Sequence, residues 1–432
     1  MNARTASTLA FVLALPLLAA CQRGTAPARP AKGDYAVQTW VLPAEAGSMA
    51  PDLVAGPGGR VLLGWINRRE GRRNALQFAS YTEADGWQSQ PRTIAVGNAL
   101  QANAADTPHL LATPDGALWA QWVQAQPDAA GGTDVVLARS KDGGMAWEQI
   151  TRVNTDGMPT EHGFAALWAD GSNGAGIAWL DGRGKRPAPA HAAVAGTHDV
   201  SSAHDEGEGD MQLRANRFTL DLARASDAVV APRSCDCCQV AVAITSRGPL
   251  LAWRGRDANE VRDIATARYQ QGAWTAPRIA HADGWKVEGC PVNGPALAAR
   301  DANVALAWYS EGNGGPALWL ARSGDAGDSF APPLQVDAGP GVLGRPAVAM
   351  DARQVWVAWL REENGGQRLQ LARYAPDLAG KPLQVLTVAR LATRGLASGY
   401  PRLVVDEGGA WLAWTDVDAS GIAHLKGARV TR

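Results

Sequence analysis

The tripeptide Leu412-Ala413-Trp414 recurs with small changes along most of the chain, and this repeat decides the fold. Each copy is a short apolar segment that ends in tryptophan. The seven copies end at Trp65, Trp122, Trp179, Trp253, Trp308, Trp359 and Trp414. Their spacings are 57, 57, 74, 55, 51 and 55 residues. A nearly constant period of this length indicates a repeat architecture, in which each unit buries its faces against its neighbours.

Other strand-like segments flank each tryptophan segment at similar distances. One precedes it, as at Pro108–Ala112, and another follows it, as at Ala321-Arg322-Ser323. A further segment completes most units, as at Pro333–Val336. Four short strands in a unit of this size are typical of one blade of a β-propeller. The 48 glycines and the lack of a sustained helical stripe also favour an all-β chain with many turns.

The two ends of the chain indicate how the ring closes. The last unit shows three strands before Arg432, and the alternating segment Tyr35–Leu42 precedes the first complete unit. Pairing that N-terminal strand with the last unit would remove exposed sheet edges. We therefore predict a closed propeller with seven blades. Six blades are the alternative, if the first or last tryptophan strand belongs to a shared blade.

Two turns between the third and fourth strands carry the same pattern of residues. The aspartate suits capping of the turn backbone, the glycine suits a positive φ, and the aromatic ring closes the gap. The pattern, Ser-x-Asp-x-Gly-x-x-Trp or Phe, resembles the Asp-box of bacterial neuraminidases, or sialidases. That resemblance implies a sialidase-like propeller, with these turns on the face away from its active site. The residues of the pattern are Ser140, Asp142, Gly144 and Trp147, and then Ser323, Asp325, Gly327 and Phe330.

The N-terminus has the form of an export signal. The apolar run Leu9–Leu18 follows Arg4 and is too short to span a bilayer. Leu18-Ala19-Ala20-Cys21 resembles a bacterial lipobox, which implies cleavage before Cys21 and its acylation; an ordinary secretory signal is the alternative. The expected organisation is a signal peptide at 1–20, the lipidated cysteine and a flexible tether at 21–34, and the propeller at 35–432, with an insertion at 182–210.

This organisation predicts a lipid-anchored protein of the cell envelope. Gln22 stands where inner-membrane retention would favour aspartate, so the outer membrane is the favoured location, on either its periplasmic or its surface face. The membrane is thus the expected partner, through the lipid. A formal net charge of −1 supplies no excess of cations to displace the counterions of a nucleic acid, so a nucleic-acid partner is not expected.

The repeat predicts that the other four cysteines share one face. Cys235, Cys237 and Cys238 precede the first strand of one unit, and Cys290 has the same place in the next. In an oxidising envelope two disulfides are the first interpretation, for example Cys237 with Cys238 and Cys235 with Cys290, although other pairings stay open. A copper or zinc site that includes His162 is an alternative. Thiol redox chemistry is the third.

Two other segments carry clustered polar residues. The loop after Trp253 could clamp an anionic or polyol ligand through guanidinium forks and carboxylates, or its charges could pair with one another. Its candidate ligand-binding residues are Arg256, Asp257, Glu260, Arg262 and Asp263. The insertion at 182–210 holds three histidines and several carboxylates, which suit a divalent cation but are more typical of a solvated flap.

The sialidase resemblance also implies a catalytic set. Sialidases hold the substrate carboxylate with three arginines and use a tyrosine nucleophile, a glutamate partner and an aspartate acid/base. By position alone, the candidates are Arg254, Arg345 and Arg402, with Tyr400 as nucleophile, Glu161 as its partner and Asp52 as the acid. The Arg-Ile-Pro signature of sialidases is absent from the first unit. The stretches at 235–239, 260–264 and 289–295 further resemble exported bacterial proteins labelled sialidase-like, without an established activity.

The sequence therefore favours a membrane-tethered propeller that binds a glycan or a protein ligand on its cysteine-bearing loop face. An exo-sialidase is one alternative. An envelope metal-binding protein is the other.

Overall fold

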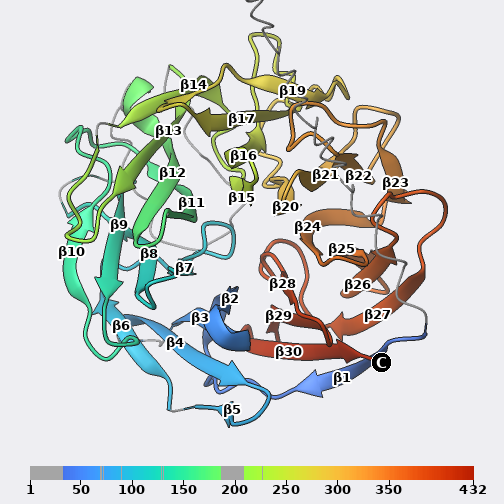
Figure 1. Ribbon diagram of the computed structural model, residues 1–432, viewed down its shortest axis with the longest axis horizontal. Helices are drawn as coiled ribbons and strands as arrows, with labels where there is room; N and C mark the ends of the chain where they lie inside the picture. The colour runs from blue at the N-terminus through green and yellow to red at the C-terminus, as the bar shows by residue number, and fades with distance from the viewer. Residues whose placement is uncertain are drawn as a thin grey trace, which may run out of the picture.

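Seven antiparallel sheets form a closed ring in the computed structural model (Figure 1). The structure describes residues 33–432 apart from 69–70, 72, 89, 128, 130, 186–208 and 226. Cys21, most of the tether and the three histidines of the insertion lie outside the described residues. The prediction of seven blades is confirmed, and the alternative of six is wrong.

Each blade begins with a strand at the centre of the ring and ends with a strand at its rim (Figure 1). The first three blades consist of β2 (Ser48–Gly56), β3 (Arg60–Asn67), β4 (Asn74–Thr82), β5 (Gly86–Trp87) and β6 (Arg92–Gly97); β7 (His109–Ala112), β8 (Leu118–Ala125), β9 (Thr133–Ser140) and β10 (Glu148–Arg152); and β11 (His162–Asp170), β12 (Gly174–Asp181), β13 (Met211–Phe218) and β14 (Ala228–Ser234).

The next three blades follow the same order along the chain. They consist of β15 (Ala241–Thr245), β16 (Gly248–Arg254), β17 (Ile264–Gln270), β18 (Ala273–Trp274) and β19 (Arg278–His281); β20 (Ala296–Arg300), β21 (Asn303–Ser310), β22 (Ala317–Ser323) and β23 (Leu334–Ala338); and β24 (Val342–Met350), β25 (Val355–Glu363), β26 (Gly366–Tyr374) and β27 (Gln384–Leu391). The helical elements of the described residues are two short 3₁₀ turns, Pro57–Gly59 and Gly182–Gly184. Nothing helical there is long and apolar enough to cross a membrane.

The last blade contains both ends of the described chain. It consists of β28 (Arg402–Val405), β29 (Gly409–Val417), β30 (Ala423–Thr431) and the N-terminal strand β1 (Ala36–Trp40). β1 pairs antiparallel with β30, from Ala36 opposite Thr431 to Trp40 opposite Gly427. The predicted closure of the ring by the N-terminal strand is confirmed. Closure gives β30, which would otherwise be an open edge, a hydrogen-bonded partner.

The tryptophans of the repeat lie in the second strand of every blade. All seven are buried, and the most exposed of them, Trp414, is only 6% accessible. A second strand has a neighbour on each side within its blade, and its two faces pack against the adjacent blades. A large aromatic side chain there fills the space between blades. This packing explains why tryptophan recurs with the period of the blade.

The two Asp-box turns are built alike. In the hairpin between β9 and β10, Ser140 Oγ donates to Asp142 Oδ1 at 2.7 Å and accepts from the Gly144 N–H at 2.8 Å. Gly144 has φ +86°, and a Cβ there would lie 2.1 Å from Cζ of Phe78. Gly327 takes the same place between β22 and β23, with φ +90°. Both turns hold the outer strands and the neighbouring blade in register.

Candidate functional site

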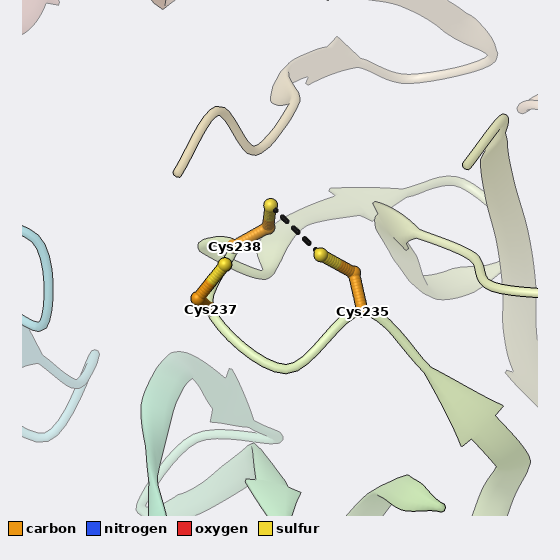
Figure 2. A group of neighbouring side chains, drawn as sticks. All are labelled: Cys235, Cys237 and Cys238. Atoms are coloured by element: carbon orange, nitrogen blue, oxygen red, sulfur yellow. Dashed lines mark hydrogen bonds between the residues drawn. The ribbon is translucent and has the colours of Figure 1, made fainter. Parts of the chain in front are cut away.

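Four cysteines gather where two successive blade connections meet. Cys237, just before β15, forms a disulfide with Cys290, in the connection between β19 and β20, and their Cα atoms are 5.9 Å apart. Cys235 and Cys238 are not in this disulfide; their sulfur atoms are 3.1 Å apart, and the Cys237 sulfur lies within 4.8 Å of both (Figure 2). The repeat thus predicted the gathering correctly. The suggested pairings of Cys237 with Cys238 and of Cys235 with Cys290 are wrong, because Cys237 bonds to Cys290.

His162 is held by oxygen atoms rather than directed at a metal. Its Nδ1 lies 2.7 Å from the Thr133 carbonyl oxygen, and its Nε2 lies 2.9 Å from Asp156 Oδ2. Burial disfavours the imidazolium, but the hydrogen bond to Asp156 and the charge of Asp181 outweigh burial and raise the pKa of His162. A ring that donates from both nitrogens has no lone pair for a metal. His162 is grouped with Asp156 and Asp181, whose ligand atoms lie within 4.8 Å of one another, and not with the cysteine cluster to which the sequence-based interpretation assigned it.

A cavity of about 290 Å³ opens beside the cysteine loop, and we call it the Asp106 pocket. The connections that precede β7, β11, β15 and β20 all contribute to its wall. The described residues that line it include no lysine and no arginine. Its polar and larger apolar lining residues are Gln101, Asn103, Asp106, Val123, Thr133, Glu161, His162, Phe164, Leu180, Met211, Asp236, Cys237, Val292 and Leu396.

Asp106 is held against the backbone at the start of β11. Its Oδ1 accepts the Phe164 N–H at 2.8 Å, and a Cβ at position 163 would lie 2.1 Å from its Oδ2, so Gly163 makes room for the carboxyl group. Burial raises the pKa of Asp106 to about 7, with a further contribution from the charge of Glu161. The Phe164 N–H opposes this rise without cancelling it. Asp106 can therefore gain or lose a proton near neutral pH.

The sequence-based candidates had not included Asp106, whereas Glu161 was among them. Asp106 lies in the connection from β6 to β7, which belongs to the same set of loops as the cysteines. Glu161 lies in the next such connection and lines the same pocket. The position of the loop within the repeat was the one available signal. Of the six catalytic candidates, only Glu161 lines the Asp106 pocket.

Two of the three candidate arginines are used to hold loops together. Arg254 is 1% exposed and donates to the carbonyl oxygens of Asn293, Arg262 and Tyr309 at 2.9, 2.6 and 2.7 Å. Arg345 is 4% exposed and donates to Ser398 Oγ at 3.0 Å and to a backbone carbonyl at 2.9 Å. Neither guanidinium faces the Asp106 pocket. Both arginines are buried and hold loops together. They therefore do not form the predicted clamp for a substrate carboxylate.

A second cavity, of about 280 Å³, lies on the axis of the ring, and we call it the axial cavity. The innermost strand of every blade lines it, and Arg402, Asp52 and Tyr400 all lie there. Arg402 donates to the Pro51 carbonyl at 3.0 Å and lies 3.8 Å from Asp52. The Tyr400 hydroxyl donates to the Val292 carbonyl, and burial raises the pKa of that tyrosine.

Asp52 does not have the environment of a general acid. Burial raises its pKa, but His109, 3.3 Å away, together with Arg402 and the Leu110 N–H, more than reverses the effect and leaves the pKa lowered. A carboxyl group with a lowered pKa is ionised at neutral pH and has no proton to donate. Asp52 is thus an ion-pairing residue in this structure, contrary to the role suggested for it.

The charged loop after Trp253 pairs with itself. Glu260 lies 3.0 Å from Arg256 and 2.7 Å from Arg262. Asp257 accepts the backbone N–H groups of Asn259 and Val261 at 2.8 and 2.9 Å, and Asp263 accepts that of Gly284 at 3.1 Å. The charged residues therefore pair with one another and shape the loop, as the alternative interpretation expected. The loop does not form the predicted ligand clamp.

Comparison with known proteins supports the fold and finds no relative by sequence. No family model matches the chain, and no curated protein matches its sequence. Among solved structures, the polysaccharide lyase Uly1 aligns with a TM-score of 0.51 and 8% identity, over 89% of each chain. A protein of unknown function from Dyadobacter fermentans aligns with a TM-score of 0.48 and 13% identity, over 89% of this chain and 95% of that one. The NanB sialidase from Streptococcus pneumoniae aligns with 0.45 and 10%, over 89% and 68%.

The seven four-stranded blades establish a β-propeller, and the alignment with Uly1 agrees with that fold. At such low identity the likeness concerns the fold alone. A function has to be argued from the site itself.

Proposed function

We propose that the protein is a lipid-anchored envelope protein whose propeller binds a neutral glycan in the Asp106 pocket. The observation that carries this proposal is the convergence of carboxyl and amide side chains in one cavity on the cysteine-bearing face. Asn103, Asp106 and Glu161 offer donors and acceptors of the kind that hydroxyl groups pair with, and Phe164 adds an apolar surface. The volume of about 290 Å³ suits one sugar unit at the end of a chain.

The charge of the pocket favours a neutral ligand over a sialoside. Asp106, Glu161 and Asp236 line it without a lysine or an arginine among the described lining residues. Asp236 is paired with Lys185 and Arg256, and His162 with Asp156, so Asp106 and Glu161 give the pocket its remaining negative charge. Recognition of a carboxylate normally uses guanidinium forks, and two like charges at 4 Å repel by about 4 kcal/mol near a protein surface. The exo-sialidase alternative needs an arginine cluster at the ligand, and Arg254 and Arg345 are buried and donate to protein acceptors.

A second candidate function, cleavage of a neutral glycan, follows from the proton affinity of Asp106. Glycosidases separate the pKa values of two carboxyl groups, so that one donates a proton while the other stays ionised. The pKa of Asp106 is raised to about 7, partly by the charge of Glu161. Asp106 would then protonate the leaving oxygen, and Glu161 would be the second carboxyl group, the one that stays ionised.

Binding of defined oligosaccharides to the full-length lipoprotein in detergent tests the first proposal. Saturation-transfer NMR with neutral oligosaccharides, and with sialyllactose as the anionic comparator, identifies the class of ligand. We expect Asp106→Ala to weaken binding of a neutral oligosaccharide by about tenfold or more, which corresponds to about 1.4 kcal/mol. Glu260→Gln, on the self-paired loop, is the matched control and should bind as the wild type does.

The alternatives have separate signatures in the same preparation. Release of new reducing ends from a bound neutral oligosaccharide, lost in Asp106→Asn, would promote glycan cleavage over binding alone. Turnover of a fluorogenic sialoside that is lost in Arg345→Ala and Arg402→Ala, but kept in Asp106→Ala, would overturn our proposal in favour of the exo-sialidase. Stoichiometric copper or zinc in the purified protein would favour the metal-binding alternative.

A further inference from the structure

The two cysteines outside the disulfide form a buried pair with Cys-x-x-Cys spacing. Cys235 and Cys238 are 0% and 2% exposed, and their sulfur atoms are 3.1 Å apart (Figure 2). The sulfur atom of Cys237, which is bonded to Cys290, lies within 4.8 Å of both. A thiol pair is thus in position next to one sulfur of an existing disulfide.

A guanidinium group distinguishes the two thiols. Arg262 Nη1 donates to Cys235 Sγ at 3.3 Å. Burial raises the pKa of the Cys235 thiol, but the hydrogen bond from Cys238 and the charge of Arg262 outweigh burial and lower the pKa to about 6. Burial and the nearby Cys235 raise the pKa of Cys238. The pair is therefore a Cys235 thiolate that accepts a hydrogen bond from the Cys238 thiol.

The same guanidinium argues against a metal ion at this pair. Arg262 uses a lone pair of the Cys235 sulfur and brings a positive charge to within 3.3 Å of it. A cation bound to the two sulfurs would meet that charge in a buried site, where screening is weak. A thiolate beside a guanidinium is instead the arrangement of a nucleophilic cysteine.

We propose that the four cysteines form a thiol–disulfide exchange centre, in which the buried Cys235–Cys238 pair exchanges with the Cys237–Cys290 disulfide. In the first step the Cys235 thiolate attacks Cys237 Sγ. The Cys235–Cys237 bond forms, the Cys237–Cys290 bond breaks, and its electron pair leaves on Cys290 as a thiolate. In the second step the Cys238 sulfur attacks Cys235, its proton passes to the departing Cys237, and a Cys235–Cys238 disulfide results. One disulfide replaces another, so no external oxidant or reductant is needed.

The geometry selects Cys235 as the attacking residue. Cys238 is the chain neighbour of Cys237, and consecutive Cα atoms are about 3.8 Å apart, whereas disulfides usually join Cα atoms about 4.4–6.8 Å apart. The Cys290 residue is partly exposed, whereas Cys235, Cys237 and Cys238 are at most 2% exposed. The exchange therefore carries reducing equivalents from a buried pair to a partly exposed cysteine. This centre does not depend on glycan binding in the Asp106 pocket.

Native-state alkylation of the full chain tests the proposal. The folded protein is incubated without reductant in N-ethylmaleimide, and peptide mapping after cleavage with trypsin and at Asp236 assigns each labelled cysteine, so Cys21 does not interfere. We expect labelling of Cys290 over time in the wild type, because exchange releases its thiolate. In Cys235→Ser the labelling of Cys290 should slow by about tenfold or more, since no attacking thiolate remains.

Two further variants give the test a matched control and a safeguard. Cys238→Ser keeps the first step and blocks the second, so Cys290 should be labelled while Cys237 is found bonded to Cys235. Arg262→Gln keeps all four sulfurs but removes the charge beside Cys235, and should slow labelling of Cys290 even if Cys235→Ser fails to fold.

Three results would overturn the exchange centre. The first is labelling of Cys290 at the same rate in the wild type, Cys235→Ser and Arg262→Gln. The second is a purified protein in which all four sulfurs are bonded, as Cys237–Cys290 together with Cys235–Cys238. The third is stoichiometric copper or zinc bound to these sulfurs. Glycan binding that is lost in Asp106→Ala would stand after the first two of these results, so the two proposals fail separately.

Discussion

The Asp106 pocket and the axial cavity hold the same kind of side chain in opposite states. Asp52 is buried and Asp106 is half-buried, and desolvation raises the pKa of each. Around Asp52, His109 and Arg402 reverse the effect, whereas Asp106 has a second carboxylate, Glu161, as its charged neighbour. Burial alone does not mark a functional carboxyl group. A buried carboxyl group without a compensating cation does, because its proton affinity falls in the range that chemistry and binding use.

The largest predicted effect concerns the arginines, which support the structure without facing the pocket. Arg254→Ala removes three hydrogen bonds to buried carbonyls and the contact of the guanidinium with the Trp285 ring, 4.6 Å away. We expect the free energy of unfolding, measured with urea, to fall by about 3–4 kcal/mol. A loss below about 1 kcal/mol would mean that this guanidinium is not committed to the loops and remains open to a ligand.

The next effect is a dependence of stability on pH that Asp106 causes. Its pKa lies near its ordinary value of 3.8 in the unfolded chain and at about 7 in the folded protein. The stabilising contribution of the protonated group is complete below about pH 4 and is lost as pH rises to about 7. We expect Asp106→Asn to match the wild type at pH 4 and to exceed its free energy of unfolding by up to about 4 kcal/mol at pH 8, since the pKa rises by about three units and one unit corresponds to about 1.4 kcal/mol. Urea unfolding at the two pH values measures this.

Asp52→Asn is the matched variant with the opposite sign. The pKa of Asp52 is lowered on folding, so its contribution is present above its ordinary value and is lost as pH falls. The variant should therefore be less stable than the wild type at pH 7, by ~2 kcal/mol, with the difference shrinking toward pH 3. Equal pH dependence in the two variants would remove the distinction between the two cavities.

The smallest effect should come from the charged loop. Glu260→Gln weakens ion pairs with Arg256 and Arg262, in a carboxylate whose side chain is 22% exposed. We expect thermal unfolding to show a loss of ~1 kcal/mol or less, because pairs open to solvent contribute little. A loss of several kcal/mol would show that this loop is as deeply structural as Arg254.

The fold could be predicted because its strongest constraint repeats. A tryptophan such as Trp253 fills the space between two blades, and each of the seven blades needs a similar residue. The ring closure followed from one strand too few at the C-terminus and one too many at the N-terminus. The gathering of Cys237 and Cys290 followed from the same repeat, since equivalent positions in adjacent blades are neighbours in space.

The candidate site was less predictable because its properties arise between distant residues. Asp106 follows two alanines in an ordinary loop, and its environment comes from Glu161 and Phe164, more than 50 residues later. The arginines suggested by position are polar in the sequence, but Arg254 and Arg345 proved to be paired with carbonyl oxygens, which no pattern in the sequence reveals. The choice of Cys290 as the partner of Cys237 likewise depends on side-chain direction.

The proposed function depends on Asp106 being a half-buried carboxyl group whose pKa is about 7. Carbon-detected NMR of aspartate-labelled protein, with Asp106→Asn to assign the signal, measures it directly. We expect the Asp106 carboxyl group to titrate with a pKa of about 7, and Glu161→Gln to move this midpoint downward. A midpoint at or below the ordinary value of 3.8 would contradict the assignment of this pocket as the functional site.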